Sequence, residues 1–161
     1  MGEGFRVPIG LRLNQAARTV GRAFEEALEE AGGTLPTWLI LLNLTIRKPA
    51  NQRELAEAVG IREATLTHHL NALDARGLIT RTRDPANRRI HVVELTEAGQ
   101  AAFARLQQAA VAFDARLRAG LSDADLDQLG DLLGRLAANA GVPEPDDAPP
   151  WVGLAKPGRP G

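Results

Sequence analysis

The stretch GLITRTRDPANRRIHVVELT, residues 77–96, has the composition of a β-hairpin in a chain whose other apolar residues recur at helical spacing. Residues 78–82 and 90–95 are rich in β-branched and apolar side chains, as strands are. Between them lies the segment Asp84-Pro85-Ala86-Asn87, whose residue types favour a tight turn. Arginines gather around this turn, at Arg76, Arg81, Arg83, Arg88 and Arg89. The sequence therefore predicts a hairpin with a cationic tip, suited to contact with an anionic partner.

Two helices are predicted at the start of the chain. Apolar residues three and four apart form one helical face and end at the pair Gly32-Gly33. Pro36 suits the first turn of a second helix, which Pro49 stops. The predicted apolar positions are Leu13, Ala17, Val20, Phe24 and Leu28 in the first helix, and Trp38, Leu41, Leu42 and, at its end, Ile46 in the second.

A pair of short helices follows, directly before the hairpin. Asn51 with Glu54 is a plausible N-terminal cap, and Gly60 closes the first of the two helices after residues 55–59. The second, at residues 62–76, turns Leu66, Leu70 and Leu73 inward and ends at Gly77. A helix, a tight glycine turn, a helix and then an arginine-tipped hairpin together predict a winged helix. Such a fold places its second helix in the major groove of DNA and its hairpin on phosphates or the minor groove.

Two long helices are predicted after the hairpin, capped by Thr96 and by Ser122 with Asp125. We expect one domain over residues 1–141, with a DNA-binding lobe at about 36–95 and dimerisation helices at about 8–31 and 96–140. Six of the ten prolines lie in the last 21 residues, so residues 142–161 are expected to form a flexible tail. The predicted stripes are Phe103, Leu106, Ala110, Phe113 and Leu117, then Leu126, Leu129, Leu132, Leu133 and Leu136. These stripes exceed what one small core needs, so a homodimer is expected, with contacts from Leu13, Phe24, Leu129, Leu132 and Leu136.

The middle of the chain resembles the MarR family of transcriptional regulators. GLITRTRDPANRRIHVVELTEAGQAAF is similar to the family's wing signature, and NQRELAEAVGIREATLTHHLNALDARGLI is similar to the helix pair before it. The resemblance covers roughly residues 10–140. It implies a mainly helical winged-helix homodimer that binds pseudo-palindromic double-stranded DNA, as a repressor released by a small molecule. Two residues depart from the pattern: Asn87 stands where the family usually has Asp, and Arg62 where it usually has Ser or Thr.

Candidate DNA contacts follow from the resemblance and from spacing. Thr65 and His68 point away from the inward leucines, and Ala64 and Thr67 flank them. The predicted set is Arg62, Ala64, Thr65, Thr67 and His68 on the helix, with Arg81, Arg83, Arg88 and Arg89 on the hairpin.

A candidate ligand pocket is implied between the first, second and fifth helices. Trp38 and Leu42 are its expected apolar walls, Arg12 or Arg18 a cation at the rim, and His69 a residue near its floor. Such a lining suits a small aromatic acid or a phenol. The alternative is that Trp38 is plain core and that both arginines face solvent or DNA.

Composition limits the other classes of function. The chain has no cysteine, which excludes disulfides and thiol switches, and its lone serine, Ser122, is explained as a cap. We therefore expect no enzyme activity, no cofactor, no membrane partner and a cytoplasmic protein. Residues 47–94 carry nine Lys and Arg against six Asp and Glu, whereas the whole chain has a formal charge of −1. The basic region is thus a local patch, of the kind that binds nucleic acid.

Two alternatives stay open. The segment TLTHHLNAL is similar to the metal-sensing ArsR family, and His68, His69 and His91 are the histidines available for a metal. Adjacent helical residues point about 100° apart, so His68 and His69 make a poor ligand pair by themselves, and no metal ligand is assigned. The second alternative is a winged-helix module that binds proteins and has no operator.

Overall fold

The computed structural model describes residues 7–47, 51–83, 86 and 91–141 of the 161-residue chain. Within these ranges it is mainly helical with one two-stranded antiparallel sheet. The elements are α1 (Ile9–Glu30), α2 (Leu35–Ile46), α3 (Gln52–Val59), α4 (Glu63–Ala75), β1 (Ile79–Arg83), β2 (His91–Leu95), α5 (Glu97–Leu117) and α6 (Asp123–Asn139). The predicted fold class is confirmed, and none of these described helices is long and apolar enough to cross a membrane.

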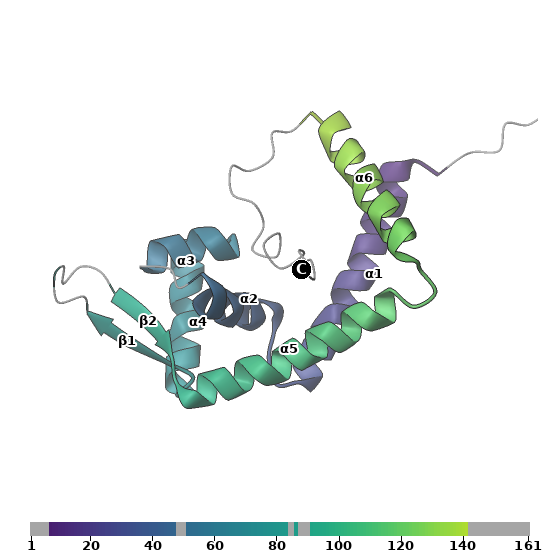
Figure 1. Cartoon of the computed structure of the whole chain (residues 1–161). Coiled ribbons are helices and arrows are strands. Elements are labelled where there is room, and N and C mark those ends of the chain that lie inside the picture. Colours follow the sequence, from purple (N-terminus) through teal and green to yellow (C-terminus); the bar gives the residue numbers. More distant parts are fainter. Residues whose placement is uncertain (1–6, 48–50, 84–85, 87–90, 142–161) are drawn as a thin grey trace, which may run out of the picture.

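The elements form two regions joined by α5 (Figure 1). A compact lobe of α2, α3, α4 and the hairpin lies at the N-terminal end of α5. At the other end of α5 lie α6 and the first half of α1, which we call the arms (α6 and residues 9–22 of α1). The second half of α1 packs against α5, through Phe24 and Phe113, whose ring centroids are 5.1 Å apart.

Side-chain caps explain where the helices begin. The Asn51 side chain accepts a hydrogen bond from the backbone N–H of Glu54, and Thr96 accepts one from that of Gly99. Ser122 and Asp125 form a reciprocal capping box at α6. These three predicted caps are confirmed. Each satisfies an N–H group that the first turn of a helix leaves without an intrahelical partner.

Glycines end α3 and α4 where the chain must turn sharply. Gly60 has φ of 77° and Gly77 has φ of 68°, in the left-handed region that side chains with a Cβ rarely adopt. Gly60 sets the tight turn from α3 into α4, and Gly77 sets the turn from α4 into the hairpin.

The first strand begins and ends one residue later than predicted, at Ile79 and Arg83, and the second is described over His91–Leu95. The register of the hairpin pairs Ile79 with Leu95 and Arg83 with His91. Leu78 was predicted to open the first strand, but its N–H donates to the carbonyl of Leu73 and its own carbonyl accepts from Thr96. The first bond closes the end of α4, so Leu78 belongs to the turn, and the second joins this turn to Thr96, the residue after β2. Ile90 and most of the predicted tip, residues 84–85 and 87–90, lie outside the described residues, as do Pro49 and the tail at 142–161.

The lobe contains most of the hydrophobic core, which the second half of α1 and the first half of α5 complete. Gly99 shows how tightly α5 joins it, because a Cβ at this position would collide with the carbonyl oxygen of Leu78. The most deeply buried apolar side chains are Leu28, Ile40, Leu41, Leu55, Leu66, Leu70, Ile79 and Leu106.

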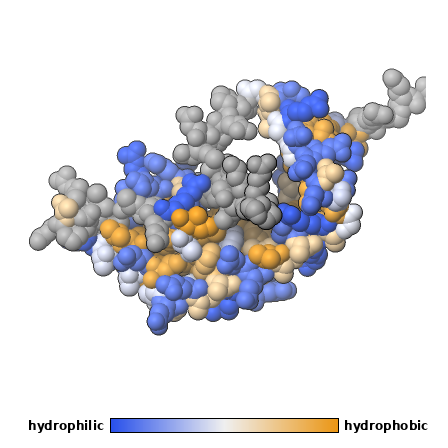
Figure 2. Space-filling view, viewed as in Figure 1, coloured by the Kyte–Doolittle hydropathy of each residue, from blue (hydrophilic) through white to orange (hydrophobic). Residues whose placement is uncertain are grey.

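The arms are exposed within one chain. No residue of α6 is buried, and all of residues 9–22 of α1 are exposed. Apolar side chains accordingly appear on the surface of this region (Figure 2). Leu117, predicted to continue the α5 stripe, is also exposed. The exposed large apolar residues of the arms are Ile9, Leu11, Leu13, Val20, Leu129, Leu132 and Leu133.

Candidate nucleic-acid interface

Helix α4 presents one face to the core and the opposite face to solvent. Leu66, Leu70 and Leu73 are buried at positions i, i+4 and i+7, as expected for one stripe of a helix. The five helix residues predicted to contact DNA are all exposed, namely Arg62, Ala64, Thr65, Thr67 and His68. The structure therefore leaves this predicted set available to a partner.

The side chains of this face are held to different degrees. The Thr67 hydroxyl donates to the carbonyl of Glu63 at 2.9 Å, which turns its proton back onto the helix. The imidazole rings of His68 and His69 meet edge to face, with centroids 5.9 Å apart. His69 is half-buried whereas His68 is exposed, as their positions on the helix predict. His68 and Thr65 thus form the centre of the exposed face.

The start of α4 has no side-chain cap. Arg62 occupies the cap position in extended backbone and makes no capping hydrogen bond. A helix start favours anions because its first N–H groups point outward, and an arginine here adds a positive charge. Glu63, in the first turn, offsets part of that charge.

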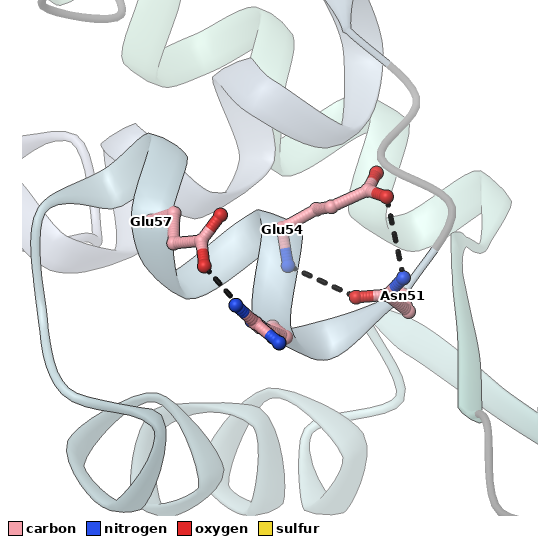
Figure 3. A network of polar contacts seen from close by, with 4 residues as sticks. Asn51, Glu54 and Glu57 are labelled. Atoms are coloured by element: carbon pink, nitrogen blue, oxygen red, sulfur yellow. Dashed lines mark hydrogen bonds and ion pairs between the residues drawn. The ribbon is translucent and has the colours of Figure 1, made fainter. Parts of the chain in front are cut away.

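The neighbouring helix α3 carries an arginine whose charge is paired with a carboxylate of the same helix (Figure 3). Arg53 Nε lies 3.0 Å from Glu57 Oε1, and this hydrogen bond raises the pKa of the Arg53 guanidinium. Asn51 Nδ2 also donates to the Glu54 carboxylate at 3.3 Å. Because Arg53 is paired with a carboxylate, α3 adds little positive charge to the face of α4.

Along β1, the side chains alternate between the body and solvent. Ile79 is buried and Arg81 half-buried, whereas Thr80, Thr82 and Arg83 are exposed. Arg83 is therefore placed as the prediction requires. The structure does not describe Arg88 and Arg89, so their predicted contacts stay predictions.

Arg81 is placed differently from Arg62 and Arg83, which are exposed. Its Nη1 donates to Asn71 Oδ1 at 2.7 Å, and its Nη2 donates to Gln52 Oε1 at 2.9 Å. The prediction grouped Arg81 with the DNA contacts, but in the structure its guanidinium is hydrogen-bonded to side chains of α4 and α3. Neither Asn71 nor Gln52 was singled out from the sequence, where they lie 10 and 29 residues from Arg81.

The bond to Asn71 fixes where the hairpin lies. Asn71 follows His68 by one turn of α4 and is exposed on the same face. The hairpin therefore lies beside the exposed face of α4, and the two form one continuous surface. Among the described residues, no group of three His, Asp or Glu side chains is arranged to hold a metal there.

The five predicted pocket residues are not brought together within one chain. Trp38 and Leu42 are buried in the core, and the Trp38 ring stacks on Phe103 with centroids 5.5 Å apart. Arg12 and Arg18 are exposed on α1, about 24 and 15 Å along the helix axis from Leu28, the α1 residue that enters this core. His69, on α4, is half-buried. A separate open hollow of about 370 Å³ lies on α5, lined by Gln107, Gln108, Val111, Ala112 and Ala115.

Proteins of one family of transcriptional regulators match this chain in sequence and in fold. The sequence profile of the MarR family matches residues 34–91. A protein of Thauera aromatica, named as a transcriptional regulatory protein for the hcr operon, is 30% identical over 129 residues, covering 80% of this chain and 78% of the relative.

Two solved structures extend the comparison. The transcriptional repressor CouR, bound to a 23-mer DNA duplex, superposes with a TM-score of 0.72 at 32% identity, covering 81% of this chain and 92% of CouR. A structure of CouR bound to p-coumaroyl-CoA gives a TM-score of 0.68 at 30% identity, covering 81% of this chain and 91% of that one.

Proposed function

The chain belongs to the MarR family of transcriptional regulators, and we propose that it is a homodimeric repressor that binds a pseudo-palindromic operator in the cytoplasm. The observation that carries this proposal is the continuous surface of α4 and the hairpin. On it, Thr65 and His68 are exposed between an uncapped helix start and a strand that ends in Arg83.

The two parts of this surface have different tasks. A helix fits the major groove, where Thr65 and His68 reach base edges and so carry sequence preference. Arginines on a hairpin reach phosphates, which adds affinity without sequence preference. Arg83 belongs to this second group, together with Arg88 and Arg89 as the sequence predicts.

Dimerisation follows from the arms. Their leucines are exposed in the described part of the chain, and a second copy related by a twofold axis supplies a cover. Two copies of α4 then meet half-sites about one DNA turn apart.

The test begins with duplexes selected from a random pool. Substituting Thr65→Ala or His68→Ala changes the preferred bases at particular positions, by roughly 1–3 kcal/mol each. Substituting Arg83→Ala weakens binding to every sequence and lowers the slope of log affinity against log salt by about one. Selection that enriches no palindrome, or variants that bind like the unchanged protein, would count against the operator and favour a protein-binding module.

The proposed effector is an aromatic acid or its coenzyme A thioester. Two observations support it: the aromatic cluster of Trp38 and Phe103 beside α1, and the p-coumaroyl-CoA bound to CouR. The ring would pack near Trp38 and Leu42, close to His69. Arg12 and Arg18 lie about 24 and 15 Å along the axis of α1 from Leu28, the α1 residue in this core. They therefore suit the distant phosphates of a thioester better than the carboxylate of a small acid.

Calorimetry separates these effectors. We expect p-coumaroyl-CoA to bind more tightly than p-coumarate or free coenzyme A, and to lower operator affinity by favouring a dimer whose helices no longer match the half-sites. The variant Arg12→Ala with Arg18→Ala should weaken binding of p-coumaroyl-CoA and of free coenzyme A, which both carry the phosphates, and leave binding of p-coumarate unchanged. If no compound of the three binds below millimolar concentration, or if binding leaves operator affinity unchanged, the effector proposal fails and the operator proposal stands.

A further inference from the structure

Arg81 is the one hairpin arginine whose guanidinium the structure shows bonded to other elements of the lobe. Its two terminal nitrogens donate to Asn71 on α4 and Gln52 on α3, at 2.7 and 2.9 Å. A single side chain thereby links β1 to both helices of the helix-turn-helix. Its third nitrogen, Nε, is buried and has no hydrogen-bond partner in the described part of the chain.

The direction of this side chain follows from the strand. Successive side chains of a strand point to opposite faces, so Ile79 and Arg81 share the inner face of β1. Arg81 pairs in register with Val93, which is buried, whereas its neighbours Thr80 and Thr82 are exposed. Arg81 thus points toward the body of the lobe, where two of its five N–H groups donate to Asn71 and Gln52.

The partners of Arg81 are neutral amides. A guanidinium that meets a carboxylate forms an ion pair, but Asn71 and Gln52 offer amide oxygens without charge. Planar geometry lets the two terminal nitrogens reach two acceptors at once, which a lysine cannot reproduce. The contacts therefore hold the strand in a fixed direction and leave the positive charge uncancelled by these partners.

The position of Arg81 along β1 makes these contacts important. A two-stranded hairpin has little stability of its own and depends on contacts with the body. Ile79 at the base of the hairpin and Val93 opposite Arg81 supply buried contacts, and Arg83, the next residue on the inner face, is already exposed. Arg81 is consequently the outermost residue of the inner face of β1 that the structure shows bonded to the body.

We propose that Arg81 is a positioning residue, which sets the direction of the hairpin beside the exposed face of α4 and makes no contact with phosphate. The proposal rests on the proposed function, since direction matters only if the hairpin and α4 bind one duplex together.

The experiment separates position from charge. The substitutions Gln52→Ala and Asn71→Ala, made together, remove the acceptors and leave Arg81 in place. We expect operator affinity to fall at least about tenfold, because two hydrogen bonds to a charged group are lost, with the salt slope unchanged because no positive charge is lost. Arg81→Lys should weaken binding similarly. Added to the double substitution it should cost less than about twofold more, because the residues act as one unit.

Arg83→Ala and Thr80→Ala are the matched comparisons on the same strand. Arg83→Ala should lower the salt slope by about one, whereas Arg81→Ala should not. Thr80→Ala, on the outer face beside Arg81, should leave hydrogen exchange of the hairpin unchanged. A drop in slope for Arg81→Ala equal to that of Arg83→Ala, or fully independent effects of Arg81→Lys and the amide substitutions, would overturn the proposal.

Hydrogen exchange gives a second measurement that needs no DNA. In the Gln52→Ala and Asn71→Ala variant, amides of residues 79–83 and 91–95 should exchange faster, while those of α5 keep their rates. Unchanged hairpin rates would show that Arg81 does not hold the strand. If the protein without substitutions bound no selected duplex, the proposed function would fail. The exchange rates would still decide whether Arg81 positions the hairpin.

Discussion

The lobe and the arms are built from similar amphipathic helices, but within the described residues only the leucines of the lobe are buried by other elements of the chain. In α4, Leu66, Leu70 and Leu73 are covered by other elements of the same chain. In α6, leucines at equivalent spacing remain exposed, with Leu129 at 48% and Leu132 at 45%. The same sequence pattern therefore means an internal core in one region and an exposed apolar surface in the other.

The largest effect is expected in the arms. Leu129→Asp with Leu132→Asp places carboxylates in an apolar seam, at a cost of several kcal/mol for each buried charge. The dimer dissociation constant should rise more than about a thousandfold, measured by analytical ultracentrifugation. Ala124→Asp, on the polar face of α6, adds charge without entering the seam and should leave the mass unchanged. A dimer that survives the double substitution would mean that the leucines of α6 do not close it.

In the monomeric variant with Leu129→Asp and Leu132→Asp, shortening a core leucine should lower the free energy of unfolding more than shortening an arm leucine. Leu70→Ala empties a fully buried site and should lower the free energy of unfolding by about 2–5 kcal/mol. Leu133→Ala, at a site 41% exposed, should cost far less. Chemical denaturation of both variants measures the difference. Equal losses would contradict the contrast between a closed lobe and open arms.

The junction between the two regions offers a smaller test. Gly99→Ala forces α5 away from the carbonyl of Leu78 and should cost about 1–3 kcal/mol, the usual range for overpacking. Gly134→Ala meets no atom within 4 Å and should instead stabilise α6, by roughly 0.5–1 kcal/mol. Thermal unfolding of the two variants, made side by side, should show shifts of opposite sign.

The smallest effect concerns pH at the start of α6. The Ser122 hydroxyl, and then its backbone N–H, hydrogen-bond to the Asp125 carboxylate and lower the pKa of Asp125. A lowered pKa in the folded state stabilises the protein above the ordinary pKa of aspartate, and this contribution is lost as pH falls through the lowered value. The difference in melting temperature between the unchanged protein and Asp125→Asn should therefore shrink below about pH 4. A difference that stays constant down to pH 2 would contradict the cap.

Local patterns in the sequence were sufficient for the elements and much of the surface. Caps at Asn51, Thr96 and Ser122 were predictable because each involves residues within three positions of one another. The exposed face of α4 followed from helical spacing, which places Thr65 and His68 away from the leucines. The family was recognisable from the hairpin and the helix pair for the same reason, since both are short contiguous motifs.

Long-range contacts decided the rest. The sequence marks Arg81 as one arginine among several, and only folding brings it to Asn71 and Gln52 on two other elements. Likewise, Arg12 and Arg18 share a helix with residues of the core, but the length of α1 separates them from Trp38 within one chain. Hydrogen bonds and periodicity within a helix depend on neighbours in the sequence, so the sequence by itself determined them. Which arginine bonds within the lobe and which leucines remain exposed depend on how distant segments pack, so only the tertiary structure decided them.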